Sequence, residues 1–153
     1  MRLRMSLLDR LIDDDPGRAR DPILNRTEEM RAVRNGFRRD LEGLLNTRRL
    51  CRSPPAAYKE LSNSILSYGI EDFIGAPLAT YEQRQELVTA VEQTIADFEP
   101  RFTTVSVTLI KARDPAERQQ TIRIEAIVQL EQGPEPLIFQ TVLDPTTQTF
   151  RVE

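Results

Sequence analysis

The sequence has no histidine, no tryptophan and a single cysteine, Cys51. Without histidine, a Ser-His-Asp triad or a Cys-His pair is excluded, and the commonest zinc ligand is missing. With one cysteine, intramolecular disulfides, CxxC redox motifs and cysteine-rich zinc sites are excluded as well. We therefore expect no metal and no cofactor, and the lone thiol fits a reducing compartment.

Long apolar runs and the common catalytic motifs are also missing. No stretch approaches the roughly 18 apolar residues of a membrane span. The N-terminus, MRLRMSLLDRLIDDD, has neither the apolar stretch nor the small-residue cleavage site of a secretory signal. No GxGxxG, P-loop, GxSxG or HExxH is present. We expect a cytoplasmic protein with no direct membrane insertion.

The balance of residue types is that of a globular domain. The chain has 153 residues, of which 39% are hydrophobic and 29% charged, and its formal net charge is −3. Leu7, Leu8, Leu11 and Ile12 fall on one stripe of a helix that is too short to stand alone. We predict a docking helix and linker over residues 1–22 and a single domain over residues 23–153.

Two long helices are predicted from their starting residues and their apolar stripes. Asn25 with Glu28, and Thr80 with Gln83, have the spacing of capping boxes. The stripes that follow are Met30, Val33, Phe37, Leu41, Leu44 and Leu45 in the first helix, and Leu87, Val88, Val91, Ile95 and Phe98 in the second. Pro100 ends the second helix. A shorter helix is predicted over Ala57–Ser67, with Leu61 and Ile65 inward and Tyr68-Gly69 as its left-handed stop.

After Pro100 the period changes from 3.6 to 2. The alternating runs are centred on Val105–Leu109, Ile122–Leu130, Leu137–Leu143 and Phe150–Val152. The connections are short enough for antiparallel hairpins. The predicted fold class is therefore α+β, with N-terminal helices packed on a C-terminal, largely antiparallel sheet of about four strands.

Carboxylates are the remaining candidates for catalysis. Asp97, Glu99 and Glu125 could serve a glycosidase by residue type. Sugar sites usually also offer aromatic platforms, and this chain has no tryptophan, three tyrosines and six phenylalanines. The arginines between residues 31 and 52 could bind phosphates, but few aromatics are interleaved with them. We expect no catalytic residue and no nucleic-acid partner.

The most unusual local feature is Phe98-Glu99-Pro100-Arg101-Phe102, at the switch from helix to strand. Pro100 fixes φ and holds Glu99 and Arg101 in a set relation. Acidic residues near a helix C-terminus are disfavoured by the macrodipole, which suggests a compensating partner. Two interpretations stay open: a contact with another protein, or an intramolecular salt bridge that fixes the corner.

Several segments in order along the chain resemble TssE, the small baseplate subunit of type VI secretion systems, which is similar to the lysozyme-like wedge protein of contractile phage-tail baseplates. The segments are Ser6–Leu11, Leu44–Arg49, Tyr68–Phe73, Phe98–Phe102 and Phe139–Asp144. The turn at Asp144–Gln148 departs from the pattern, because it lacks the glycine expected at such a hairpin.

The resemblance implies a structural, non-enzymatic role in a contractile injection machine, with a peptidoglycan hydrolase as the alternative. It implies wedge partners TssF and TssG, with TssK in the same baseplate at the inner face of the cytoplasmic membrane, and sheath partners TssB and TssC. It places the family's interaction motif on Glu99, Pro100 and Arg101, and we expect Arg48 and Arg49 to bind partners too.

The last predicted strand, Thr149–Glu153, has an open edge unless another element covers it. An edge of this kind can accept a strand from another chain. We therefore expect Phe150 and Val152, with the strand Leu137–Asp144, to contribute the surface on which the sheath begins to assemble.

Overall fold

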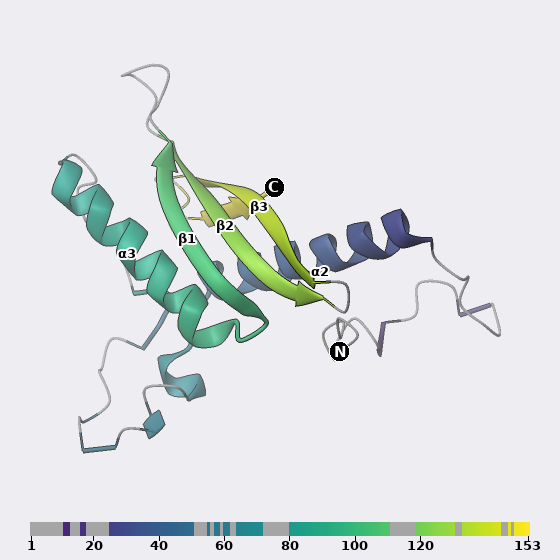
Figure 1. Ribbon diagram of the computed structural model, residues 1–153. Coiled ribbons are helices and arrows are strands. Elements are labelled where there is room, and N and C mark those ends of the chain that lie inside the picture. Colours follow the sequence, from purple (N-terminus) through teal and green to yellow (C-terminus); the bar gives the residue numbers. More distant parts are fainter. Residues whose placement is uncertain are drawn as a thin grey trace.

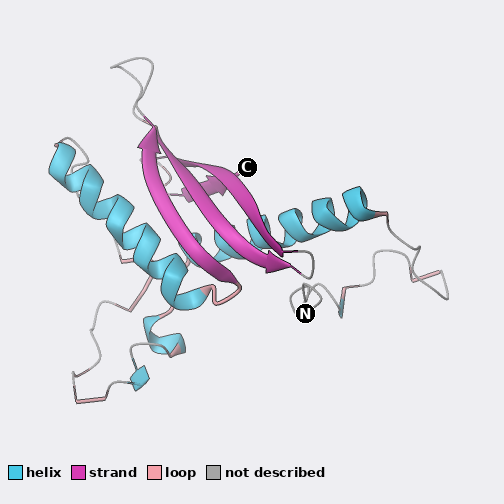
Figure 2. Cartoon of the chain, viewed as in Figure 1, coloured by secondary structure: helices cyan, strands magenta, loops and turns pink. Residues whose placement is uncertain are grey.

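The computed structural model describes residues 11–12, 16–17, 25–50, 55, 57–58, 60–61, 64–71, 80–110, 119–130, 133–144, 147 and 149–153. Within these residues two α-helices precede a four-stranded sheet (Figures 1 and 2). The helices are α2 (Arg26–Asn46) and α3 (Tyr81–Phe98). The strands are β1 (Phe102–Ile110), β2 (Gln120–Leu130), β3 (Gly133–Asp144) and β4 (Thr149–Val152). The α+β prediction is confirmed.

Both long helices begin as their capping boxes predict. The side chain of Asn25 accepts a hydrogen bond from the backbone of Glu28, and the Glu28 side chain accepts one from the backbone of Asn25. Thr80 and Gln83 make the same reciprocal pair at the start of α3. These two bonds satisfy backbone N–H groups that a helix start leaves without an intrahelical partner.

The sheet is a meander in which each strand is antiparallel to its neighbour, in the order β1-β2-β3-β4. Alternate residues of β2 and β3 point to one face and are buried: Ile122, Ile124, Ala126, Val128, Leu137, Phe139, Thr141 and Leu143. The apolar stripes of α2 and α3 join the same core cluster. Both helices therefore lie against that face, with α3 beside β1 and α2 crossing near β4 (Figure 1).

A β-bulge at the start of β1 changes the alternation. The register shifts between Phe102, which is opposite Val128, and Thr104, which is opposite Ile127. In a regular strand Phe102 and Val107, five residues apart, would point to opposite faces of the sheet. Because the bulge adds one residue, both side chains are buried on the same face. The bulge carries the chain from the end of α3 into the sheet while keeping the Phe102 side chain in the core.

The predicted helix over Ala57–Ser67 is wrong. The described part of this segment makes successive i→i+3 turns rather than an α-helix: Glu60 and Leu61 have 3₁₀ conformation, and Ile65–Ser67 is a short 3₁₀ helix, η2. Ile65 is 87% exposed rather than inward. Serine side chains compete for the backbone here: Ser64 Oγ and Ser67 Oγ both donate to the carbonyl of Leu61.

Gly69, two residues after this segment, does have the predicted left-handed conformation. Gly69 has φ +100°, and a Cβ there would lie 2.3 Å from the carbonyl oxygen of Thr47. The close approach brings Ile70 against the end of α2, where its N–H donates to Thr47 and its carbonyl accepts from Arg49.

The predicted docking helix of residues 1–22 lies mostly outside the described residues.

Candidate functional site

The corner between α3 and β1, which we define as Glu99, Pro100 and Arg101, is a hydrogen-bonded turn. The N–H of Glu99 donates to Ile95 and closes the helix, and the N–H of Phe102 donates to the carbonyl of Glu99 at 3.1 Å. Pro100 occupies the second position of this four-residue turn, where its fixed φ is favoured. The turn returns the Arg101 side chain toward Glu99.

Arg101 pairs with two carboxylates inside the chain. Its Nε donates to Glu99 Oε1 at 2.5 Å, and its Nη2 contacts both Glu99 Oε2 and, at 2.6 Å, Asp40 Oδ2 of α2. The Glu99 side chain is only 8% exposed, whereas those of Arg101 and Asp40 are 27% and 24% exposed. The intramolecular salt bridge anticipated as one interpretation of the corner is therefore present.

Aromatic rings complete the setting of this ion cluster. The guanidinium carbon of Arg101 lies 4.3 Å from the centre of the Phe37 ring, which in turn stacks on Phe102 at 4.8 Å. Tyr68 meets Phe98 edge-on at 5.3 Å. Residues from α2, α3, β1 and the segment after η2 therefore fix the corner together.

The cluster changes the protonation of two of its members. Hydrogen bonds to Glu99 raise the pKa of Arg101 above its usual value, assisted by Asp40, although burial acts in the opposite direction. Burial raises the pKa of the Tyr68 hydroxyl, and the negative charges of Asp40 and Glu99 raise it further. Arg101 is therefore a permanent cation and Tyr68 a neutral phenol near neutral pH.

Arg48 and Arg49 differ in their settings. Arg49 donates from Nε to the carbonyl of Ser67 at 3.0 Å and lies 3.6 Å from Glu71. The backbone of Arg48 forms an isolated parallel bridge with Ile70, and its side chain is exposed. Arg49 thus joins the end of α2 to the segment after η2, while Arg48 presents its side chain at the surface.

Phe150 and Val152 place their side chains in the core, where they are 5% and 0% exposed. Only their backbone lies at the sheet edge, and a truncation of β4 would remove core side chains. The edge is partly covered: the Asn46 carboxamide of α2 accepts from the N–H of Phe150 and donates to its carbonyl, both at 2.8 Å.

The three carboxylates considered for catalysis are not gathered in one site. Glu99 is held by Arg101, and Asp97 accepts a hydrogen bond from Gln93. Glu125 is half-exposed on the sheet face opposite the helices, where it pairs with Arg123 at 2.7 Å. The sheet therefore lies between Glu125 and the other two.

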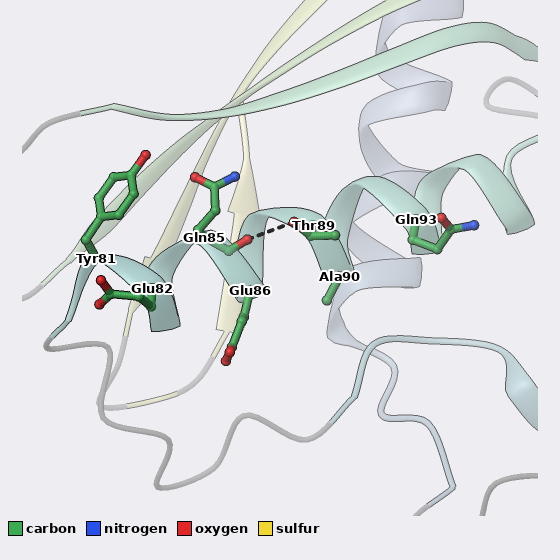
Figure 3. A pocket seen from close by; sticks show the side chains of 7 residues that line it. All are labelled: Tyr81, Glu82, Gln85, Glu86, Thr89, Ala90 and Gln93. Atoms are coloured by element: carbon green, nitrogen blue, oxygen red, sulfur yellow. Dashed lines mark hydrogen bonds between the residues drawn. The ribbon is translucent and has the colours of Figure 1, made fainter.

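A shallow pocket runs along the outer flank of α3, between Tyr81 and Gln93 (Figure 3). Its seven lining residues come from this one helix, and they include the acids Glu82 and Glu86. None of the residues predicted as site residues lines it. In the part of the chain that is described, no group of three potential metal-binding side chains occurs, and no helix is long and apolar enough to cross a membrane.

Two of the residues that shape these sites, Asp40 and Asn46, were not singled out by the sequence. Asp40 lies three residues after Phe37, so it borders the buried stripe of α2, and a carboxylate in that position is a usable signal. Asn46 reads in the sequence only as a helix-ending residue. Its partner Phe150 is 104 positions away, and no local sequence pattern predicts the contact.

Comparison with known families gives the class of this α+β domain, which is that of structural proteins from the baseplates of contractile machines. The family described as baseplate wedge protein gp25 matches residues 31–133, which is more than half of the chain. The chain belongs to this family. No curated protein and no solved structure matches it.

Proposed function

We propose that this protein is the TssE-type wedge subunit of a type VI secretion baseplate, acting as a non-enzymatic assembly component in the cytoplasm at the inner face of the membrane. The observation that carries the proposal is the gp25 family match over residues 31–133, which includes the corner. The family is structural, and the carboxylates considered for hydrolysis lie apart or are already paired.

The corner is suited to a contact with the wedge subunits TssF and TssG, which sit with TssK in the same baseplate. Pro100 is exposed, and Arg101 keeps about a quarter of its side chain at the surface. Its Nη1 makes no hydrogen bond to any described residue, so it can donate to a carbonyl or carboxylate of a partner. The intramolecular pairing holds the guanidinium in one orientation before the partner arrives, which lowers the entropic cost of binding.

The sheath subunits TssB and TssC are the second set of proposed partners. The outer edge of β4 retains backbone groups at Val152 that have no partner in the described residues. A strand added to such an edge gains main-chain hydrogen bonds. This edge supports the proposal that the subunit provides a starting surface for sheath assembly.

The experiment is a pull-down of the tagged protein from its native cell extract, with mass spectrometry of what it retains. We expect TssF, TssG and TssK with the wild type, and at least tenfold less with Arg101→Lys, because lysine cannot reproduce the planar fork. Arg38→Lys, at an exposed position of α2, is the matched control and should retain the partners. Recovery without any baseplate component would overturn the proposal, as would digestion of purified peptidoglycan above a boiled control.

A further inference from the structure

The N-terminal half of α2 carries no buried residue. The buried residues of this helix all lie in its second half: Gly36, Phe37, Leu41, Leu44 and Leu45. Between Arg26 and Asn35 every side chain is exposed or half-buried, and in Figure 1 this half of the helix runs past the end of the sheet. Most of the stability of a helix in a protein comes from packing one of its faces. This half of α2 therefore has faces available for another molecule.

One flank of this half is basic, and we call Arg31, Arg34 and Arg38 the α2 basic flank. The three arginines are three and four residues apart, so they lie on one side of the helix on successive turns. Arg34 donates from Nη2 to the carbonyl of Ile138 at 2.9 Å, and its guanidinium carbon is 5.7 Å from the centre of the Phe139 ring. Arg31 and Arg38 are exposed and make no hydrogen bond or ion pair with the described residues. Their Cα atoms are about 10 Å apart along the helix axis.

The outer flank of α3 carries the opposite charge. The shallow pocket of Figure 3 lies between two rows of side chains with four-residue spacing. The rows are Glu82, Glu86 and Ala90, and Tyr81, Gln85, Thr89 and Gln93. Both glutamates are exposed, about 6 Å apart along the axis, and the Tyr81 side chain is 70% exposed. We call Tyr81, Glu82 and Glu86 the α3 acidic flank.

The α3 acidic flank has the groups that recognise an arginine. A guanidinium is planar, donates two parallel hydrogen bonds to a carboxylate and stacks on an aromatic ring. Glu82 and Glu86 supply the carboxylates and Tyr81 supplies the ring. The groove between two rows of side chains on one helix can also receive a row from another helix. Arg34 and Arg38 have the same four-residue spacing as the two glutamates, so the two flanks match in charge and in spacing.

The two flanks cannot meet within one molecule. The helix α3 lies beside β1, at one edge of the sheet, whereas Arg34 of α2 reaches β3, with β2 between the two strands (Figure 1). The complement of each flank is therefore on another copy of the chain. Such a contact is heterologous, because each copy uses one flank toward one neighbour and the other flank toward the next. Repetition of the contact gives a closed ring or an open row of subunits.

We propose that the α2 basic flank of one subunit binds the α3 acidic flank of a second copy of this chain. Arg31 and Arg38 pair with Glu82 and Glu86, and one guanidinium stacks on Tyr81. One helix against another covers less than the roughly 800 Å² per partner of a standard interface. The contact is therefore weak between free subunits and forms where several copies are held close together. This inference goes beyond the proposed function and does not depend on it.

The test uses the purified full-length chain and sedimentation velocity over a concentration series. We expect the average mass of the wild type to rise with concentration at low salt and to return to that of the monomer at about 1 M salt, where the screening length is about 3 Å. Two charge reversals, Arg31→Glu with Arg38→Glu and Glu82→Arg with Glu86→Arg, should each weaken self-association at least about tenfold, because like charges then face each other.

The matched control is Arg26→Glu with Arg151→Glu. It makes the same change in net charge as the reversal on α2, at exposed positions outside both flanks, and should associate as the wild type does. Arg31→Lys with Arg38→Lys keeps the charge but not the planar fork, so its association should lie between that of the wild type and that of the reversal. Self-association of the control as weak as that of the reversal would show that only net charge matters, and would overturn the proposal.

Mixing the two charge-reversed variants is the decisive measurement. Each contact in the mixture again joins opposite charges, so the mixture should associate as the wild type does although neither variant associates alone. A mixture that stays monomeric would overturn the proposal, as would a wild type that stays monomeric throughout the series. If the purified chain is monomeric but Arg31→Glu with Arg38→Glu loses a component in the pull-down from cell extract, the α2 basic flank binds a different protein and the proposal is wrong.

Discussion

Replacing Arg101 with alanine removes the guanidinium that contacts both Glu99 and Asp40. Glu99 is the more deeply buried carboxylate, with a side chain only 8% exposed, and it would keep its negative charge with no cation beside it. The contact over the Phe37 ring would be lost as well. We therefore expect this substitution to destabilise the isolated subunit, whatever its effect on partners.

The size of the loss follows from burial. Removing one member of a buried ion pair costs about 3–5 kcal/mol, and partial exposure lowers that figure. Loss of the contact between the cation and the ring adds roughly 0.5–1 kcal/mol. With Arg101 27% exposed, we expect the free energy of unfolding to fall by about 2–4 kcal/mol. Since domains have about 5–15 kcal/mol in total, the variant should still fold.

Urea unfolding followed by circular dichroism measures this change. With a slope of about 2 kcal/mol per molar urea, the midpoint should fall by about 1–2 M. A double-mutant cycle with Glu99→Gln isolates the pair, and we expect a coupling of at least about 1 kcal/mol. Arg38→Ala, at an exposed position of α2, is the control and should change stability by less than about 0.5 kcal/mol.

A midpoint for Arg101→Ala that coincides with that of the control would refute this reasoning. It would mean that the ion cluster contributes nothing to folding and that Arg101 is reserved for a partner. A large loss without coupling to Glu99 would be equally damaging, because the effect would then come from the contacts with Asp40 and Phe37.

Three further predictions concern the core and the corner. Thr141→Val should raise the free energy of unfolding by about 1 kcal/mol in urea titrations, because the buried Thr141 hydroxyl has no hydrogen-bond partner among the described residues. Gly69→Ala should lower it by about 2 kcal/mol or more, since φ is +100° and the added Cβ would meet the Thr47 carbonyl; a thermal midpoint equal to the wild type would exclude this geometry. Because folding raises the pKa of the Tyr68 hydroxyl above its usual value of 10, the neutral phenol stabilises the folded state fully below pH 10, and this contribution is lost as the pH rises through the folded-state pKa. Tyr68→Phe removes the titrating group, so its urea midpoint should depend less on pH above pH 10 than that of the wild type.

The elements that could be predicted from the sequence are those whose cause is local. Asn25 and Thr80 start helices because their partners lie three residues on, and the strands of the meander show a period of 2 that burial confirms. The helix expected over Ala57–Ser67 fails for a local reason that periodicity does not register, since Ser64 and Ser67 bond to the backbone instead.

The site was predictable only in part. The corner could be found because Pro100 and its two charged neighbours are adjacent in the chain. Asp40, which shares Arg101, is 61 positions away, and Asn46 is 104 positions from Phe150. Such pairs depend on how the helices settle on the sheet, and a single sequence does not specify which polar side chain at a helix border meets which backbone group.

The contact between the first long helix and the last strand has a consequence for how the protein is made. Asn46 with Phe150, and Arg34 with Ile138, both join residues 104 positions apart. At about 5–20 residues per second, the ribosome needs roughly 5–20 s to deliver the strands that cover the apolar side of α2. Until the end of that interval α2 lacks β4, the strand that lies against its C-terminal part. A chain that ended before Phe150 would thus expose the C-terminal part of α2, which β4 otherwise covers.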